Sequence, residues 1–173
     1  MQIILCYESR PAADTDFIYI KSFLDFEYPA AKRKFKLTKI SLETKTRYNC
    51  KKIKENIKAN TNNYAHMHPN EKTYVVYCLD VDHSLKDEID NTDVIQYCKE
   101  NNYELVWFNK DVEDVFLGKQ ISDSKKTKEA ANFAKQSKIQ QLDIKLLNCH
   151  NPLTKQHYSN LKLVFDKYLK TCN

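Results

Sequence analysis

The chain has 173 residues, 42% of them hydrophobic, which is enough for one domain with a full core. It contains a single glycine, and neither GxGxxG nor GxxxxGK followed by Ser or Thr occurs, so nucleotide binding through a glycine-rich phosphate loop is not expected. The net charge of +5 permits a polyanionic partner without requiring one.

The cysteines indicate a reduced protein. None is in CxxC spacing, and Cys6 and Cys78 lie inside apolar runs, as core thiols do. An alternative is a zinc site formed by His66, His68, Cys149 and His150, although their spacing is not that of known zinc modules. The apolar run at 3–7 is too short for a signal peptide, and no run approaches the roughly 20 residues of a membrane span. We expect a cytoplasmic protein with no membrane partner.

The first third of the chain predicts a strand, a helix and a second strand. Residues 2–7 are an unbroken apolar run, typical of a buried strand, that ends at Glu8. A helix is expected from Thr15, its N-cap, to the residue before Pro29. Residues 35–42 alternate apolar and polar side chains, which predicts a strand near the sheet edge. The basic cluster before it is either a solvated face or a nucleic-acid contact, made by Lys32, Arg33 and Lys34.

The stretch 73–82, TYVVYCLDVD, is central to the predicted fold. Its apolar part predicts a strand covered on both faces, and parallel sheets bind ligands at the carboxyl ends of such strands. Asp80 and Asp82 lie at that end. Two carboxylates so close need a cation, a proton or solvent to coexist, and Mg²⁺ prefers carboxylate and phosphate oxygens. The alternative is that one aspartate caps the next helix and the other is solvated.

The other segments complete an alternating pattern. A helix is expected over 47–60 and a polar loop over 61–71, in which His66 and His68 would be exposed and without a role. A helix over 90–101, a strand over 103–108 and a short helix ending at Gly118 follow. Residues 122–138 are helix-prone with few core anchors, and Asn151–Pro152 is expected to introduce the last helix.

This order predicts an α/β fold in one domain over residues 1–173. The sheet would be four-stranded, mainly parallel and flanked by helices, with a C-terminal helical portion from about residue 122. Acidic residues follow three of its strands: Glu8, then Asp80 and Asp82, then Glu113 and Asp114. In the last pair, Val112, Val115 and Phe116 share one helix face, which leaves Glu113 about 100° around the helix from Val112.

A strand ending in Glu and a later strand ending in Asp-x-Asp are similar to the TOPRIM domain of topoisomerases, primases and OLD-type nucleases. The finer pattern resembles the RloB-like family of TOPRIM proteins. Residues 6–9, CYES, are similar to its Cys-Glu-Gly strand end, and 15–19, TDFIY, to its Thr-Glu-x-x-Tyr helix start. Residues 80–82, DVD, match its Asp-x-Asp; 112–117, VEDVFL, resemble its Phe-Glu-x-x-Leu; and 151–154, NPLT, resemble its Asn-Pro-x-Thr.

The sequence departs from that pattern near its first acid. Tyr7 is inserted between Cys6 and Glu8, Ser9 stands where the family has glycine, and the loop to Thr15 is longer. A turn that glycine makes at little cost must therefore be made in another way, which bears on the position of Glu8. A chain with Glu8 displaced would keep the fold and lack catalysis.

The resemblance implies a metal-dependent nuclease, the effector of a bacterial restriction or phage-defence system with a partner ATPase. Glu8 would be the general acid/base or a metal ligand, Asp80 and Asp82 would hold Mg²⁺ or Mn²⁺, and Glu113 would be a further metal or water ligand. Asp114 would be a helix-start charge. Two alternatives remain: a non-catalytic TOPRIM-like module that binds nucleic acid or an ATPase, and an unrelated α/β domain.

Overall fold

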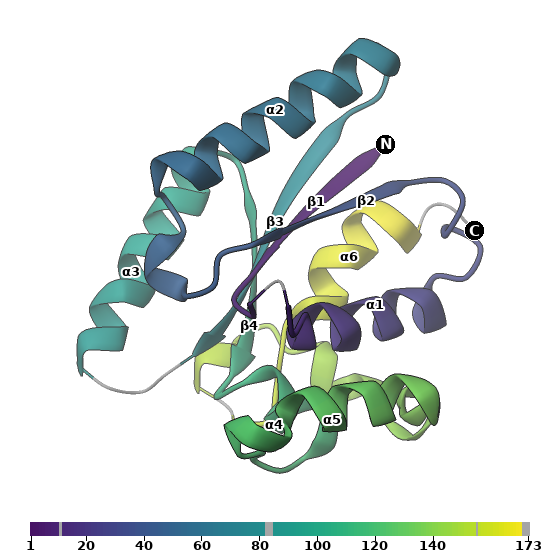
Figure 1. Ribbon diagram of the computed structural model, residues 1–173, viewed down its shortest axis with the longest axis vertical. Coiled ribbons are helices and arrows are strands. Elements are labelled where there is room, and N and C mark those ends of the chain that lie inside the picture. Colours follow the sequence, from purple (N-terminus) through teal and green to yellow (C-terminus); the bar gives the residue numbers. More distant parts are fainter. Residues whose placement is uncertain (11, 82–84, 155, 171–173) are drawn as a thin grey trace.

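Four parallel strands form the sheet that the apolar runs predict (Figure 1). The computed structural model describes residues 1–10, 12–81, 85–154 and 156–170, without the side chains of 85–90. The strands are β1 (Gln2–Tyr7), β2 (Lys36–Ser41), β3 (Thr73–Val81) and β4 (Glu104–Asn109), in the order β2-β1-β3-β4. The α/β fold class with a parallel four-stranded sheet is therefore confirmed, and β2 lies at the edge, as its alternating pattern predicts.

Helices cover both faces of the sheet and make three layers (Figure 1). The described helices are α1 (Thr15–Glu27), α2 (Lys51–Met67), α3 (Leu85–Glu100), α4 (Val112–Leu117), α5 (Asp123–Lys135) and α6 (Leu161–Leu169). Short 3-10 turns lie at Lys45–Arg47 (η1), Lys138–Gln141, Ile144–Leu147 and Pro152–Thr154. Helices α2 and α3 pack on one face, and α1, α4, α5 and α6 pack on the other. None of the helices in the described part of the chain has the length and apolarity of a membrane span.

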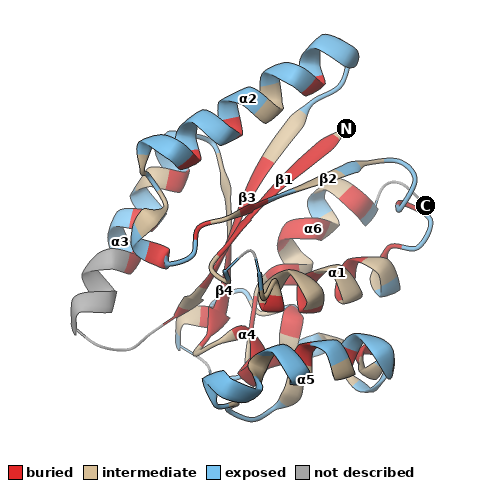
Figure 2. Cartoon of the chain, in the orientation of Figure 1, coloured by how far each residue is buried: buried red, intermediate tan, exposed pale blue. Residues whose placement is uncertain are grey.

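The strand β1 shows why the sheet is buried on both sides (Figure 2). Side chains alternate across a strand, so Ile3, Leu5 and Tyr7 enter the core with α1 and α6, whereas Ile4 and Cys6 enter the core with α2 and α3. Each fully buried aliphatic side chain contributes about 1.5–3 kcal/mol relative to an exposed one. The sheet is therefore the common wall of two cores.

Helix α2 differs from the sequence prediction, whereas α5 lies within the predicted helix-prone stretch. Helix α2 begins at Lys51 and continues to Met67, so the expected start at residue 47 was wrong, and the predicted polar loop over 61–71 is helical as far as Met67. The asparagines and threonine there are weak helix formers, but Tyr64 is 4% exposed and anchors the last turns, and tertiary packing overrides propensity. Helix α5 has few core anchors, as predicted: it buries Ala130 and Phe133, and the Phe133 ring lies 4.9 Å from that of Tyr19 and 5.7 Å from that of Phe116.

Two expected helix starts are also different. The N-cap position of α1 is Asp14, not Thr15, and the Asp14 carboxylate accepts a hydrogen bond from the Tyr7 hydroxyl at 2.5 Å instead of capping the helix. Asn151–Pro152 does not introduce the last helix, because Pro152 begins a 3-10 turn. The Pro152 carbonyl accepts a hydrogen bond from the side-chain amide of the buried Asn109. The final helix starts only at Leu161, after Ser159 has bridged to β4.

Left-handed backbone is common in this chain although glycine is not. Gly118 ends α4 with a φ of 65°, as predicted. Among the described residues, non-glycine side chains occupy the other positions of positive φ: Asp14, Glu43, Asn102, Lys110, Ser137 and His157. These turns cost more than glycine turns would, because the Cβ atom crowds the following carbonyl group.

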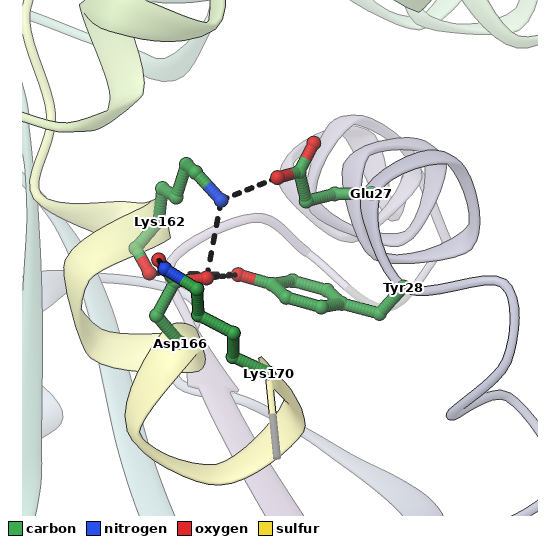
Figure 3. A network of polar contacts seen from close by, with 5 residues as sticks. All are labelled: Glu27, Tyr28, Lys162, Asp166 and Lys170. Carbon is green, nitrogen blue, oxygen red and sulfur yellow. Dashed lines mark hydrogen bonds and ion pairs between the residues drawn. The ribbon is translucent and has the colours of Figure 1, made fainter. Parts of the chain in front are cut away.

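A polar network joins the first helix to the last (Figure 3). The Tyr28 hydroxyl, just after α1, donates to Asp166 Oδ1 at 2.7 Å, and Lys162 Nζ contacts the same oxygen at 3.1 Å. Lys162 also pairs with Glu27. Burial, and then the hydrogen bond to Asp166, raises the pKa of Tyr28. Burial lowers the pKa of Lys162, but Glu27 and Asp166 outweigh it and the net shift is upward.

We predict that Tyr28→Phe destabilises the protein by about 2 kcal/mol near neutral pH, because a buried hydrogen bond to a charged group is lost. A raised pKa means that the folded state binds the phenolic proton more tightly than the unfolded state. The stabilisation is therefore complete below the unfolded value, about pH 10, and is lost as the pH rises further. The cost of Tyr28→Phe should accordingly shrink above about pH 10.

Urea denaturation over a pH series measures this cost. Tyr74→Phe is the matched control, since the Tyr74 hydroxyl makes no hydrogen bond to a described residue and its ring centroid lies 4.2 Å from that of Tyr168, in a tilted arrangement that Phe keeps. A Tyr28→Phe cost that stays constant from neutral to alkaline pH would contradict the assignment.

Candidate acidic site at the carboxyl edge of the sheet

The acidic residues that follow β1 and β3 meet where the strand order reverses. From β1 the chain goes through α1 to β2 on one side, and it then returns through α2 to β3 on the other side of β1. In open parallel sheets the crevice at such a switch point, outside the carboxyl ends of the strands, is the usual ligand site. Glu8 follows β1 and Asp80 lies near the end of β3, so both acids lie at the carboxyl edge of a parallel sheet, as predicted, and their two strands are neighbours. Asp82 lies outside the described residues.

The Glu8 carboxylate fastens three segments together. Its Oε1 accepts a hydrogen bond from the Asp80 backbone N–H at 2.8 Å, and its Oε2 accepts one from the Lys45 N–H at 3.1 Å. The ammonium group of Lys45, a residue only 5% exposed, donates to the Asp80 carbonyl at 3.2 Å. The ends of β1 and β3 and the η1 turn are therefore held in one hydrogen-bonded unit.

Ser9 shows how the chain turns after Glu8 without a glycine. Its backbone is not left-handed. The Ser9 N–H donates to Asp16 Oδ2 at 2.9 Å, and its hydroxyl accepts from the Asp16 N–H at 3.3 Å. Its carbonyl accepts from the Ser41 hydroxyl at 2.7 Å. Side-chain hydrogen bonds to α1 and β2 thus fix the turn that follows Glu8, which keeps this acid beside Asp80.

Several carboxylates act on Asp80. Burial, and then the charges of Glu8 and Asp16, raises the pKa of Asp80 well above its usual range, and Asp111 and Glu113 contribute in the same direction. Burial also raises the pKa of Asp16. Like charges this close disfavour their own ionisation. The acids of β1, β3, α1 and α4 therefore form one electrostatic cluster.

Helix α4 presents two buried acids in opposite settings. Asp111 caps the helix by accepting the Asp114 N–H at 2.7 Å. Glu113 is 1% exposed; its Oε2 lies 3.2 Å from Lys126 Nζ, and its Oε1 has no hydrogen-bond partner among the described residues. Asp114 is also buried and lies 2.8 Å from Nδ1 of His157. Asp114 therefore lies in the first turn of α4, as expected, and its carboxylate contacts a half-exposed histidine.

Lys126 of α5 is the cation of this cluster. It contacts Glu113 at 3.2 Å and Asp111 at 3.8 Å. Burial lowers its pKa, but the two carboxylates outweigh this effect and the net shift is upward, so the ammonium form persists at neutral pH. Burial raises the pKa of Glu113, partly offset by Lys126. No spacing distinguishes Lys126 or His157 from the other lysines and histidines of the chain, so neither could be predicted. Asp16 lies in the stretch 15–19 that resembles a helix-start motif, but it was not assigned a role there.

A pocket of about 390 Å³ opens over Glu8, Asp16, Asp80 and Lys126, whereas Asp111, Glu113 and Asp114 of the α4 region do not line it. It is bounded by Glu8, Ser9, Arg10, Ala13, Thr15, Asp16, Glu43, Asp80, Asp123, Lys126 and Thr127. Within the described ranges, no three Asp, Glu, His or Cys side chains are arranged to hold a metal ion. The donors that do converge are oxygens, which is the chemistry that Mg²⁺ and Mn²⁺ require.

Other candidate residues lie elsewhere. Lys32, Arg33 and Lys34 precede β2 and are exposed at the amino edge of the sheet, the opposite edge from Glu8 and Asp80. The alternative zinc ligands come from separate segments: His66 and His68 lie at the end of α2, and Cys149 and His150 lie in the segment before α6.

Comparison with protein-family models, with curated proteins and with solved structures finds no match. The geometry of the chain is therefore what carries the functional argument.

We predict that Glu8→Gln destabilises the protein by about 1–3 kcal/mol, because an amide NH₂ group replaces one of two acceptors of buried backbone N–H groups. Thermal or urea unfolding in EDTA measures the loss without metal. Glu43→Gln is the control: it borders the same pocket, but its exposed carboxylate pairs only at the surface, with Arg47, so the change should stay within about 0.5 kcal/mol. Equal effects of the two substitutions would show that the Glu8 hydrogen bonds do not stabilise the fold.

Proposed function

We propose that the acidic pocket binds a divalent cation, Mg²⁺ or Mn²⁺, and hydrolyses phosphodiester bonds of nucleic acid. One observation carries the proposal: Glu8, Asp16 and Asp80 line one pocket with Lys126, and Glu113, buried against Lys126, has a carboxylate oxygen that no described residue satisfies. A buried carboxylate without a partner is costly, and a bound cation would satisfy it. The TOPRIM resemblance supports the same reading of Glu8, Asp80 and Glu113.

The residues divide the work between them. Asp80 and Glu113 would hold the cation together with Asp82, and that cation, when bound, would neutralise phosphate charge and lower the pKa of a bound water. Glu8 is held by two backbone N–H groups and is therefore oriented before any substrate arrives. Lys126 keeps its proton at neutral pH and can donate a hydrogen bond to a phosphate oxygen.

The same geometry also favours a second candidate, a non-catalytic module that binds nucleic acid or a partner ATPase. Both Glu8 oxygens already accept backbone hydrogen bonds, and Lys126 already offsets part of the acidic charge. A cluster balanced in this way is stable without a metal. A direct test of catalysis separates the two candidates.

We predict that the protein cleaves single-stranded or duplex DNA or RNA with Mg²⁺ or Mn²⁺, and that EDTA abolishes cleavage. Asp80→Asn and Glu113→Gln should each lose about 100-fold or more in rate, the usual effect of removing one group that stabilises transition-state charge. Asp123→Asn is the matched control, because Asp123 borders the pocket and is exposed; its rate should remain within about threefold. An inactive wild type would favour the non-catalytic module, and equal rates of all variants would remove these acids from the mechanism.

A binding measurement tests the cation site without substrate. In EDTA, Asp80→Asn should melt at a higher temperature than the wild type, because one of several repelling carboxylates is removed. Millimolar Mg²⁺ should raise the melting temperature of the wild type and leave that of Asp80→Asn unchanged. A Mg²⁺ concentration of 100 times the Kd would stabilise the folded state by about 2.7 kcal/mol. A wild type indifferent to both Mg²⁺ and Mn²⁺ would contradict the cation site.

A further inference from the structure

A second groove adjoins the acidic pocket. It has a volume of about 350 Å³ and lies between the edge strand β2 and helix α2. It is bounded by Tyr7, Asp14, Lys39, Ile40, Ser41, Glu43, Arg47, Lys52, Ile53, Asn56 and Asn60. Glu43 borders both hollows, and Asp14 in the groove lies between Ala13 and Thr15 of the pocket. The two hollows are therefore neighbours at the carboxyl edge of the sheet.

Basic side chains from three elements line the groove. Lys39 comes from β2, Arg47 from η1 and Lys52 from α2. Asn56 and Asn60 follow Lys52 at four-residue intervals, so they continue along the same face of the helix. Donors in a line, with cations at one end, suit a chain of phosphate groups.

Two of these cations already hold carboxylates at the surface. Lys39 pairs with Asp14, and Arg47 lies 2.5 Å from Glu43. Exposed ion pairs contribute little to stability, so a phosphate can take the place of the Glu43 carboxylate on Arg47 at small cost. The Asp14 carboxylate is 22% exposed and also accepts the Tyr7 hydroxyl, so Lys39 would bind a phosphate beside it. The acids keep the cations in the groove in the free protein.

Helix α2 extends the positive surface beyond the groove. Residues 43–60 contain six basic and two acidic side chains. Figure 2 shows α2 as a largely exposed helix; it buries only Ile53, Ile57 and Tyr64. The exposed lysines of this helix are Lys51, Lys52, Lys54 and Lys58. Its partner must therefore tolerate a high density of positive charge.

Lys45 connects this surface to the acids. Its backbone N–H holds Glu8 and its ammonium group holds the Asp80 carbonyl, six residues before α2 begins. A polyanion lying along α2 would thus be held in a fixed relation to the acidic pocket.

We propose that the groove between β2 and α2 binds the phosphodiester backbone of nucleic acid and leads it to the acidic pocket. The inference rests on the proposed function and places the substrate contact at Lys39, Arg47 and Lys52. The cluster at 32–34 stands at the other end of β2, and a six-residue strand is roughly 20 Å long, so it is not part of this path.

Two triple variants with the same loss of charge test the path. One combines Lys39→Gln, Arg47→Gln and Lys52→Gln; its matched control combines Lys32→Gln, Arg33→Gln and Lys34→Gln. Binding of a fluorescent single strand and of a duplex of equal length, each as DNA and as RNA, is measured by anisotropy in EDTA at several salt concentrations. Melting temperatures confirm that both variants are folded.

The groove variant should lose about tenfold or more in affinity, and the slope of log affinity against log salt should fall by about 2–3, the value for three phosphate contacts. The control should lose less than about twofold. Equal losses of affinity in the two variants would show that only net charge matters, and would overturn the proposal. An unaffected groove variant would also overturn it, as would a wild type that binds none of the four probes. If the triple variant is unfolded, Lys52→Glu is compared with Arg33→Glu, both at exposed positions, under the same criteria.

Cleavage in Mg²⁺ separates this inference from the proposed function. Binding that depends on the groove residues, without cleavage, would support the nucleic-acid path and contradict the proposed hydrolase activity. Cleavage by a groove variant with unchanged affinity and rate would keep the hydrolase and remove the groove.

Discussion

The hydrogen bonds of one carboxylate decide how the carboxyl edge of the sheet is built. Parallel strands end side by side, but nothing in the ladder itself fixes the loops that leave them. Glu8 does so here, because its two oxygens accept the N–H groups of Asp80 and Lys45. A single side chain consequently positions the end of β1, the end of β3 and the η1 turn that precedes α2. Fold and site therefore share a residue, and its loss affects both.

Charge is the second constraint on this edge. Burial and mutual repulsion work against the ionised forms of Asp80 and Glu113. The compensating amine of Lys126 comes from α5, a helix that only a few buried side chains such as Phe133 attach to the core. The electrostatics of the site thus depend on the docking of a lightly anchored helix. A change in that docking would alter how strongly the acids attract a cation.

The sequence was sufficient for the sheet and for the first acids. The runs in β1 and β3 are apolar on both faces, and only a sheet covered on two sides accommodates them. Glu8 and Asp80 then follow from the rule that parallel strands end together. The end of α2 could not be predicted, because burial of Tyr64 outweighs the weak propensities around it.

The surroundings of the acids were also beyond the sequence. Lys126 is one of several lysines in α5, and only packing places it against Glu113. The cluster at 32–34 has the composition of a phosphate contact, but its position at the amino end of β2 is a property of the topology. Local patterns predict what a segment is, and the arrangement of segments decides what it meets.

The left-handed turns at Asp14 and Glu43 have a consequence for recognition. Both border the hollows at the carboxyl edge, and both are made by residues with a Cβ atom. A residue with a Cβ atom has fewer accessible backbone conformations than glycine, so the rim has fewer alternatives to the turns it makes. Glycine-rich loops enclose phosphate with main-chain amides, which a bare backbone allows to approach closely. At this rim, side chains and not backbone amides face the two hollows. A ligand is therefore selected by the charge and shape of those side-chain groups.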